Sequence, residues 1–204
     1  PDLYVDMNHK PEVSIPITPV RLLYGFRSFE DLSSVLRGTP ELTGLVDKAL
    51  VQSFFNSNED NREHYLKDLY SALMKHSLTE EGKSKLVLAT NALIARLSKQ
   101  EILSEADSLV LELRKKYPND IGLFAVYLMN IDVVPVGKAL FIEPCVPHAY
   151  LEGDMIEVMA NSDNVVRGGL PPKPCDIDTL VSIVDCTMGE GNHLIPERVE
   201  GTPF

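Results

Sequence analysis

The order of structural patterns along this chain constrains its fold more than any other feature. Residues 13–17 alternate branched apolar residues with others, and neighbouring prolines exclude a helix there. Apolar residues then recur at helical spacing from Ser28 to about Tyr117, and strand patterns return from Ile121. A parallel α/β protein would alternate strand and helix regularly. We therefore predict an α+β fold in which an all-helical insertion interrupts a β-barrel.

The helical block has recognisable starting signals. Ser28, Thr39, Asp60 and Thr79 are suitable N-caps, and Pro40 suits the first position of a helix. About five helices are expected. The predicted domains are the first part of the barrel (1–20), the helical domain (21–118), the returning barrel strands with the active-site motif (119–180), and a tail or the start of a further β-domain (181–204).

The charge and composition of the chain make some classes of binding partner unexpected. The 204 residues include 30 acidic and 19 basic side chains, for a net charge of −11. Such a surface repels nucleic acid and anionic membranes, so neither is an expected partner. The longest apolar runs, such as 121–131, are too short to cross a bilayer, and no signal peptide opens the chain. Three cysteines without C-x-x-C spacing favour a reducing, cytoplasmic location.

Ionisable residues gather in two distant segments that otherwise have the apolar pattern of strands. The first reads N-H-K-P-E over residues 8–12. The second runs from P-H-A-Y-L at 147–151 through Glu157 to N-V-V-R at 164–167, and ends at Lys173. Together they offer acids, an imidazole, an arginine and lysines. This set suits a metal ion facing a phosphorylated or otherwise anionic small molecule.

Glu12 and His148 are the candidate metal ligands. His148 follows a glycine turn, a strand and two prolines, a setting in which cupin barrels often hold a metal-binding histidine. A carboxylate such as Glu12 is a suitable companion for zinc, although at least one further ligand is required. A thiolate from the nearby Cys145 is an alternative ligand. Arg167 precedes two glycines, which would let a phosphate or oxyanion approach closely, and its alternative role is a surface ion pair.

Several motifs together resemble one family. They are N-H-K-P-E at 8–12, T-P at 18–19, G-F-R at 25–27, P-H-A-Y-L at 147–151, and S-D-N-V-V-R at 162–167. This combination is similar to the type I mannose-6-phosphate isomerases, also called phosphomannose isomerases. The matching pieces span residues 4 to about 180. The chain is thus expected to be an internal portion of such an enzyme.

The resemblance implies a zinc-dependent aldose–ketose isomerase with a cupin-type (jelly-roll) catalytic barrel that carries a helical domain. It would interconvert mannose 6-phosphate and fructose 6-phosphate through a cis-enediol, as in GDP-mannose biosynthesis. One zinc ion is implied, with Glu12 and His148 as ligands. Two further ligands, in the family's Q-x-H motif, would precede the N-H-K-P-E run. The chain alone is therefore expected to be nearly inactive, and a monomer is expected.

The resemblance also implies roles for individual residues. Arg167, Glu157 and Lys10 would be catalytic, and Lys173, Asp163 and Tyr150 would bind the substrate. Pro171 departs from the family pattern and could shift Lys173.

Two questions stay open from the sequence. The first is which group removes the C2 proton. Arginine is a poor base, so Glu157 or a zinc-bound water are alternatives to Arg167. The second is whether there is any turnover. A sugar-phosphate-binding module without turnover, or a helical interaction scaffold without metal, would also fit parts of the chain.

Overall fold

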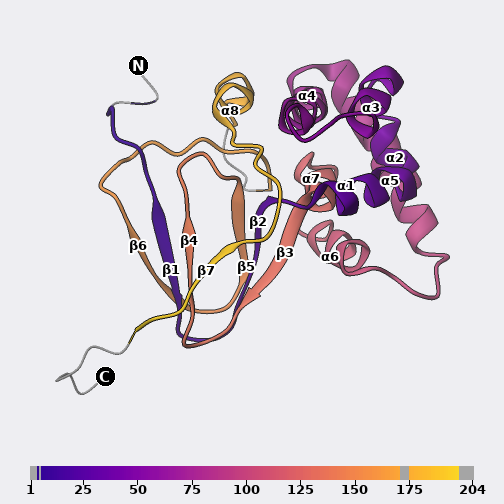
Figure 1. Ribbon diagram of the computed structural model, residues 1–204. Coiled ribbons are helices and arrows are strands. Elements are labelled where there is room, and N and C mark those ends of the chain that lie inside the picture. Colours follow the sequence, from indigo (N-terminus) through magenta and orange to yellow (C-terminus); the bar gives the residue numbers. More distant parts are fainter. Residues whose placement is uncertain (1–3, 5, 171–174, 198–204) are drawn as a thin grey trace.

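The computed structural model describes residue 4 and the ranges 6–170 and 175–197 of the chain. Figure 1 shows the strands gathered on one side of the molecule and most of the helices on the other. The chain passes from the strands into the block of helices after β2 (Val20–Phe26) and returns with β3 (Met129–Val134). An α+β fold with a helical insertion is thereby confirmed.

The elements follow the predicted order with one exception: the apolar run from Ile121, predicted as strand, forms a buried helix over 122–128, because a short apolar run does not by its pattern distinguish a buried strand from a buried helix. The chain begins with β1 (Glu12–Pro16) and β2. The helical block then contains α1 (Phe29–Gly38), α2 (Pro40–Thr43), α3 (Lys48–Phe55), α4 (Arg62–Met74), η1 (Lys75–Leu78), α5 (Glu80–Leu97), α6 (Glu105–Leu113) and α7 (Gly122–Leu128). After β3 come β4 (Ala139–Ile142), β5 (His148–Glu152), β6 (Met155–Met159), α8 (Ile177–Ile183) and β7 (Asn192–Leu194).

The strands form two antiparallel sheets, in the orders β6-β1-β4-β7 and β3-β2-β5. Strands on either side of the helical block pair directly: β1 pairs with β4 and β6, and β2 with β3 and β5. Residues 12–26 thus join the strands that follow residue 129. No helix in the described part of the chain is long and apolar enough to cross a membrane.

Strand β2 connects two hydrophobic cores. Leu22 and Tyr24 belong to a small core together with Leu140 and Ile142 of the other sheet, so this core lies between the two sheets. Leu23 and Phe26 instead belong to the large core formed mainly by the helices. Successive side chains of a strand point to opposite faces, and the irregularity between Tyr24 and Phe26 brings Phe26 to the face of Leu23, so β2 contributes to both cores.

The domain division itself stays a prediction, but the structure adds two facts about it. The strand that leads to the helical block continues to Phe26, beyond residue 20, and α1 begins at Phe29. Near the end of the chain, β7 pairs with β4, so part of the segment after residue 180 joins the four-stranded sheet.

Helix starts follow the sequence signals in most places. The predicted N-caps Ser28 and Thr79 are confirmed, since their side chains accept hydrogen bonds from Asp31 N and Gly82 N. Pro40 occupies the first turn of α2, after Thr39. The prediction for Asp60 was wrong: Asn61 precedes α4, and its side chain accepts from Asn58 N, which closes a turn just before the helix.

The side chain of Asp107 stabilises the N-terminus of α6, and this contribution can be tested by mutation. Its carboxylate accepts hydrogen bonds from Ser104 N at 3.1 Å, Ser104 Oγ at 2.6 Å and Tyr127 Oη at 2.7 Å. Burial alone would raise the pKa of Asp107, but the hydrogen bonds from Ser104 and Tyr127 hold it below the ordinary 3.8. We expect Asp107→Ala to lower the free energy of unfolding by about 2 kcal/mol, measured by urea titration at neutral pH.

The stabilisation of the folded state by Asp107 decreases in one direction of pH, towards acid. Because the folded-state pKa of Asp107 is lowered, its stabilisation is full above the ordinary pKa and is lost as the pH falls through the folded-state value. Glu105→Ala, in the same exposed first turn, is the control and should cost less than about 1 kcal/mol. Equal losses in the two variants would contradict this account of α6.

Candidate active site

The two polar segments meet at one cavity of about 770 Å³. It is bounded by β1, β5 and β6 on one side and by the segment before α8 on another. Six predicted site residues line it: Lys10, Glu12, His148, Tyr150, Glu157 and Arg167. Residues separated by more than a hundred positions are thus brought together by the pairing of strands before and after the helical block.

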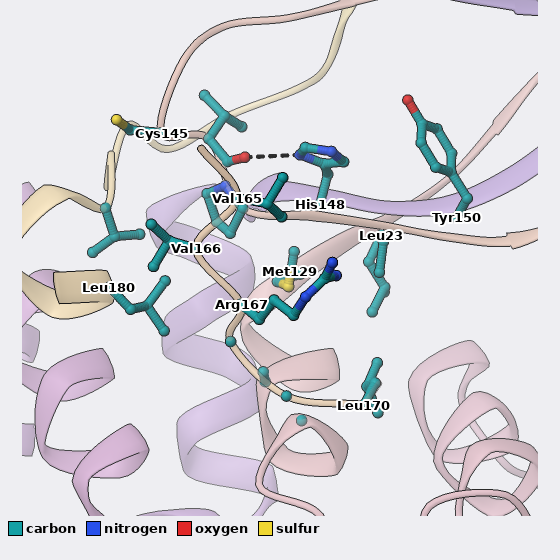
Figure 2. A pocket seen from close by; sticks show the side chains of 18 of the residues that line it. Leu23, Met129, Cys145, His148, Tyr150, Val165, Val166, Arg167, Leu170 and Leu180 are labelled. Carbon is teal, nitrogen blue, oxygen red and sulfur yellow. Dashed lines mark hydrogen bonds between the residues drawn. The ribbon is translucent and has the colours of Figure 1, made fainter. Parts of the chain in front are cut away.

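Glu12 and His148 approach each other from different sheets. Glu12 lies on β1 and is 9% exposed, and His148 begins β5. Their atoms Oε2 and Nε2 are 3.3 Å apart. The Nδ1 atom of His148 lies 3.0 Å from the carbonyl oxygen of Val146, as Figure 2 shows. A carbonyl can only accept, so Nδ1 carries the hydrogen and Nε2 is the nitrogen that faces Glu12.

The two groups shift each other's pKa in opposite directions. The hydrogen bond with His148 is the main cause that lowers the pKa of Glu12. For His148, burial alone would lower the pKa, but the hydrogen bonds with Glu12 and Val146 outweigh burial and raise it. The pair therefore favours a negative carboxylate that faces a positive charge, which either a proton or a metal ion on Nε2 can supply.

The geometry of this pair suits zinc. Two tetrahedral ligands at about 2.1 Å from zinc lie roughly 3.4 Å apart. The observed 3.3 Å between Nε2 and Oε2 agrees with this, and it is longer than a good charge-assisted hydrogen bond. The Nδ1–H bond to a backbone carbonyl is also the usual support of a metal-binding histidine. The residues present therefore fit a zinc ion as two of its ligands.

The described residues do not complete a ligand set. Among them, no group of three or more histidine, cysteine, aspartate or glutamate side chains gathers where one metal ion could be held. Cys145, the alternative thiolate ligand, is exposed, and Figure 2 shows its sulfur turned away from His148. Glu12 and His148 are thus the pair on which a metal site in this region would be built.

Glu157 and Lys10 extend the charged wall of the cavity. Glu157 lies on β6 and pairs with Ser14, on the same face of the sheet as Glu12. Burial raises the pKa of Glu157, and the hydrogen bond and negative charge of Glu12 raise it further. Lys10 precedes β1, and its Nζ atom lies 3.9 Å from Glu12 Oε1. A carboxyl group with a raised pKa is suited to proton transfer.

Tyr150 and Arg167 complete the cavity wall. Tyr150 packs edge-on against the His148 ring, with 5.7 Å between centroids, and burial raises the pKa of its hydroxyl. Arg167 comes from a segment without helix or strand. Figure 2 shows its guanidinium extending towards Leu23 and the strand of His148 and Tyr150. Within the described residues no carboxylate pairs with Arg167, so its positive charge is available to an anion.

One predicted substrate contact, Asp163, is not brought into the cavity. Asp163 is exposed and does not line it, and its backbone N–H donates to Asp6 at 3.1 Å. Lys173 lies outside the described residues. Sequence reasoning missed Asp6 and Asp120, whose side chains bind the backbone around Arg167. Only weak signals could have found them: an aspartate near the first motif, and an Asp-x-Gly turn before a helix.

Comparison with known proteins supports the same interpretation. Residues 43–129 match the model of the family described as phosphomannose isomerase type I, helical insertion domain. Mannose-6-phosphate isomerase of Rattus norvegicus is 40% identical over 197 residues, which are 92% of this chain and 45% of that protein. Mannose-6-phosphate isomerase 2 of Arabidopsis thaliana is 38% identical, with 100% of this chain and 46% of that protein covered. The chain thus spans slightly less than half the length of these relatives.

Solved structures agree with the sequence matches. A point variant of phosphomannose isomerase from Salmonella typhimurium superposes with a TM-score of 0.75 at 34% identity, over 91% of this chain and 44% of that one. A holo, zinc-bound mannose 6-phosphate isomerase gives 0.73 at 35% identity, over 90% of this chain and 43% of that one. Residues 43–129 thus belong to the helical insertion domain family of type I phosphomannose isomerase, and by its motifs and these matches the chain as a whole resembles those enzymes.

Proposed function

We propose that this chain forms the sugar-phosphate pocket and part of the zinc site of a mannose-6-phosphate isomerase. The observation that carries the proposal is the single cavity onto which Glu12, His148 and Arg167 all open, with 3.3 Å between His148 Nε2 and Glu12 Oε2. A cavity of about 770 Å³ is of a size that encloses a small ligand. The names of the curated relatives and of the zinc-bound neighbour support the same activity.

The reaction moves a proton between C2 and C1 of an open-chain sugar through a cis-enediol, so it needs proton-transfer groups and stabilisation of a negatively charged oxygen. When bound, zinc would supply a Lewis acid that polarises oxygen atoms. Arg167 would hold an anionic oxygen, either of the enediolate or of the phosphate, because its charge is not neutralised by a described carboxylate.

Glu157 is the group best suited to move protons. Its raised pKa brings the carboxyl group closer to neutral pH, where it can both give and take a proton. Lys10, beside Glu12, would orient a sugar hydroxyl, and Tyr150 would border the same space. Asp163 and Lys173 stay predictions as substrate contacts. Cytoplasmic location and a monomeric state also stay predictions.

The second candidate is a sugar-phosphate-binding module without turnover. It is favoured by one observation: the described residues offer Glu12 and His148 as a ligand pair but no group of three or more. Two protein ligands hold zinc more weakly than the three or four of established sites. Binding and turnover must therefore be measured separately.

The experiment that separates the two uses the 204-residue chain with added zinc. Formation of fructose 6-phosphate from mannose 6-phosphate is followed in a coupled assay, and binding of fructose 6-phosphate is followed by calorimetry. Because Glu12 and His148 alone hold the metal weakly, the isomerase proposal predicts zinc-dependent turnover that is low in this chain, and that Arg167→Ala lowers further, by roughly 10²–10³-fold in kcat. Arg167→Lys should restore little, because an ammonium lacks the planar fork of a guanidinium.

The outcomes are distinct. Binding that depends on Arg167 without turnover supports the binding module. Neither binding nor turnover overturns both candidates. The control is Arg114→Ala, at the end of α6, because Arg114 does not line this cavity. It should leave turnover and binding unchanged.

A further inference from the structure

The segment that carries Arg167 has no regular structure of its own. Residues 163–168 lie between β6 and α8 and are neither helix nor strand. Hydrogen bonds of a helix or sheet therefore cannot fix where the guanidinium lies. We propose that Asp6 and Asp120 are positioning residues that hold the two ends of segment 162–170 and thereby set the place of Arg167 in the cavity. The proposal rests on the function proposed for Arg167.

Asp6 holds the upstream end. Its Oδ2 atom accepts from Asp163 N at 3.1 Å and from Ser162 Oγ at 3.1 Å. Its Oδ1 atom accepts from Asn164 Nδ2 at 3.2 Å and from Asn8 N at 2.9 Å. One carboxylate thus joins the start of the Arg167 segment to the segment that leads to Lys10 and Glu12. These hydrogen bonds also lower the pKa of Asp6, with the bond from Asn8 as the main cause.

Asp120 holds the downstream end. Its Oδ1 atom accepts from Leu170 N at 2.9 Å and from Gly122 N at 2.7 Å. Asp120 lies two residues before the start of α7, so this contact ties the end of the Arg167 segment to the helical part of the molecule. A single oxygen atom therefore joins two backbone segments that lie about 50 residues apart in sequence.

The backbone at this end needs such support. Gly169 has φ +126° and Leu170 has φ +67°. The left-handed region is unfavourable for leucine, and such a conformation persists only where surrounding contacts hold it. The space is also tight, since a Cβ atom on Gly169 would lie 2.9 Å from Asp120 Oδ1. The hydrogen bond from Leu170 N to Asp120 is one contact that supports this turn.

Both carboxylates act through the segment and not on a ligand, because neither Asp6 nor Asp120 lines the cavity. Their loss should therefore change the placement of Arg167 without removing a ligand contact. A displacement of about 1 Å at a catalytic group can cost roughly 10²-fold in rate. Such an effect would be large for two residues outside the site.

Asparagine variants are expected to behave differently at the two positions, whereas both alanine variants lose the hydrogen bonds. In Asp120→Asn one amide oxygen can still accept both N–H groups, because a single oxygen accepts both in the parent. In Asp6→Asn one oxygen becomes an NH₂ group, so the bonds to Oδ1 and to Oδ2 cannot all be kept. Asp120→Asn should behave like the parent, whereas Asp6→Asn should be partly defective.

The first measurement is amide hydrogen exchange of the 204-residue chain by NMR. Asp120→Ala should speed exchange of Leu170 N–H by about tenfold or more, and Asp6→Ala should do the same for Asp163 N–H. Asp120→Asn should restore protection of Leu170. Asp178→Ala, at an exposed carboxylate of α8, is the control and should leave both amides unchanged. Unchanged exchange in both alanine variants overturns the proposal.

The second measurement is a double-mutant cycle on fructose 6-phosphate binding. If Asp120 acts through Arg167, Asp120→Ala weakens binding in the parent but has no further effect in the Arg167→Ala background. Losses that multiply in the double variant overturn the positioning role. If the parent does not bind fructose 6-phosphate, the proposed function has failed, and the exchange data alone decide whether the two aspartates hold the segment.

Discussion

Replacing His148 by alanine, or Glu12 by glutamine, is expected to abolish the zinc binding of this chain at the active-site cavity. His148→Ala removes a ligand atom and Glu12→Gln replaces an anionic carboxylate by a neutral amide, in a pair whose 3.3 Å separation suits one metal ion. The loss should exceed the roughly 10–100-fold that follows removal of an outer-shell partner of a metal ligand. Competition with a chromogenic chelator, with the protein reduced, measures the affinity directly.

A matched control separates this pair from other histidines. His64 lies on α4, is 71% exposed at its side chain and faces Asp68 in a surface pair. His64→Ala should leave zinc affinity unchanged. If His64→Ala lowers zinc affinity as much as His148→Ala, the metal binds nonspecifically at surface histidines, and the assignment of Glu12 and His148 is wrong.

Phe26→Ala should be the most destabilising single change in the folded chain. Phe26 is 0% exposed and packs edge-on against Tyr70 of α4, with ring centroids 5.2 Å apart. It lies at the end of β2, where the strands meet the helical block. Truncating a buried phenylalanine costs about 3–5 kcal/mol through lost burial and the cavity that remains. Urea titration followed by circular dichroism gives the change in unfolding free energy.

The control for Phe26 is an equally apolar but exposed side chain. Ile102 is 89% exposed, and Ile102→Ala should change the unfolding free energy by less than about 0.5 kcal/mol. Phe26→Leu should fall between alanine and the parent, because most of the buried volume is kept. A loss below about 1 kcal/mol for Phe26→Ala would contradict the role of β2 as the connection between the two cores.

The outline of the fold could be predicted because local signals agreed with the final structure. Alternation near Val13, N-caps such as Ser28 and Thr79, and the strand pattern of 131–134 all act within a few residues, whereas the apolar run before it was wrongly predicted as strand and forms α7. The pairing of strands was harder. The extent of β2 to Phe26 and the pairing of β7 with β4 depend on contacts between distant segments, which no local pattern encodes.

The residues of the site also divide into those that local motifs predict and those that depend on contacts between distant segments. Glu12, His148 and Arg167 could be named because their residue types carry chemistry and stand in recognisable motifs. Asp6 and Asp120 could not, because aspartate is common on surfaces and their role depends on which backbone N–H groups the fold brings to them. Asp163 had motif support, but its side chain is exposed, since the turn is held through its backbone instead.

The most direct measurement of the central claim is a crystal structure of this chain grown with zinc and fructose 6-phosphate, with data at the zinc absorption edge. We predict an anomalous peak between His148 Nε2 and Glu12 Oε2, and an anionic oxygen of the sugar phosphate bound to the Arg167 guanidinium in the same cavity. A zinc ion bound elsewhere, with Glu12 and His148 in direct contact and Arg167 turned to solvent, would contradict the account.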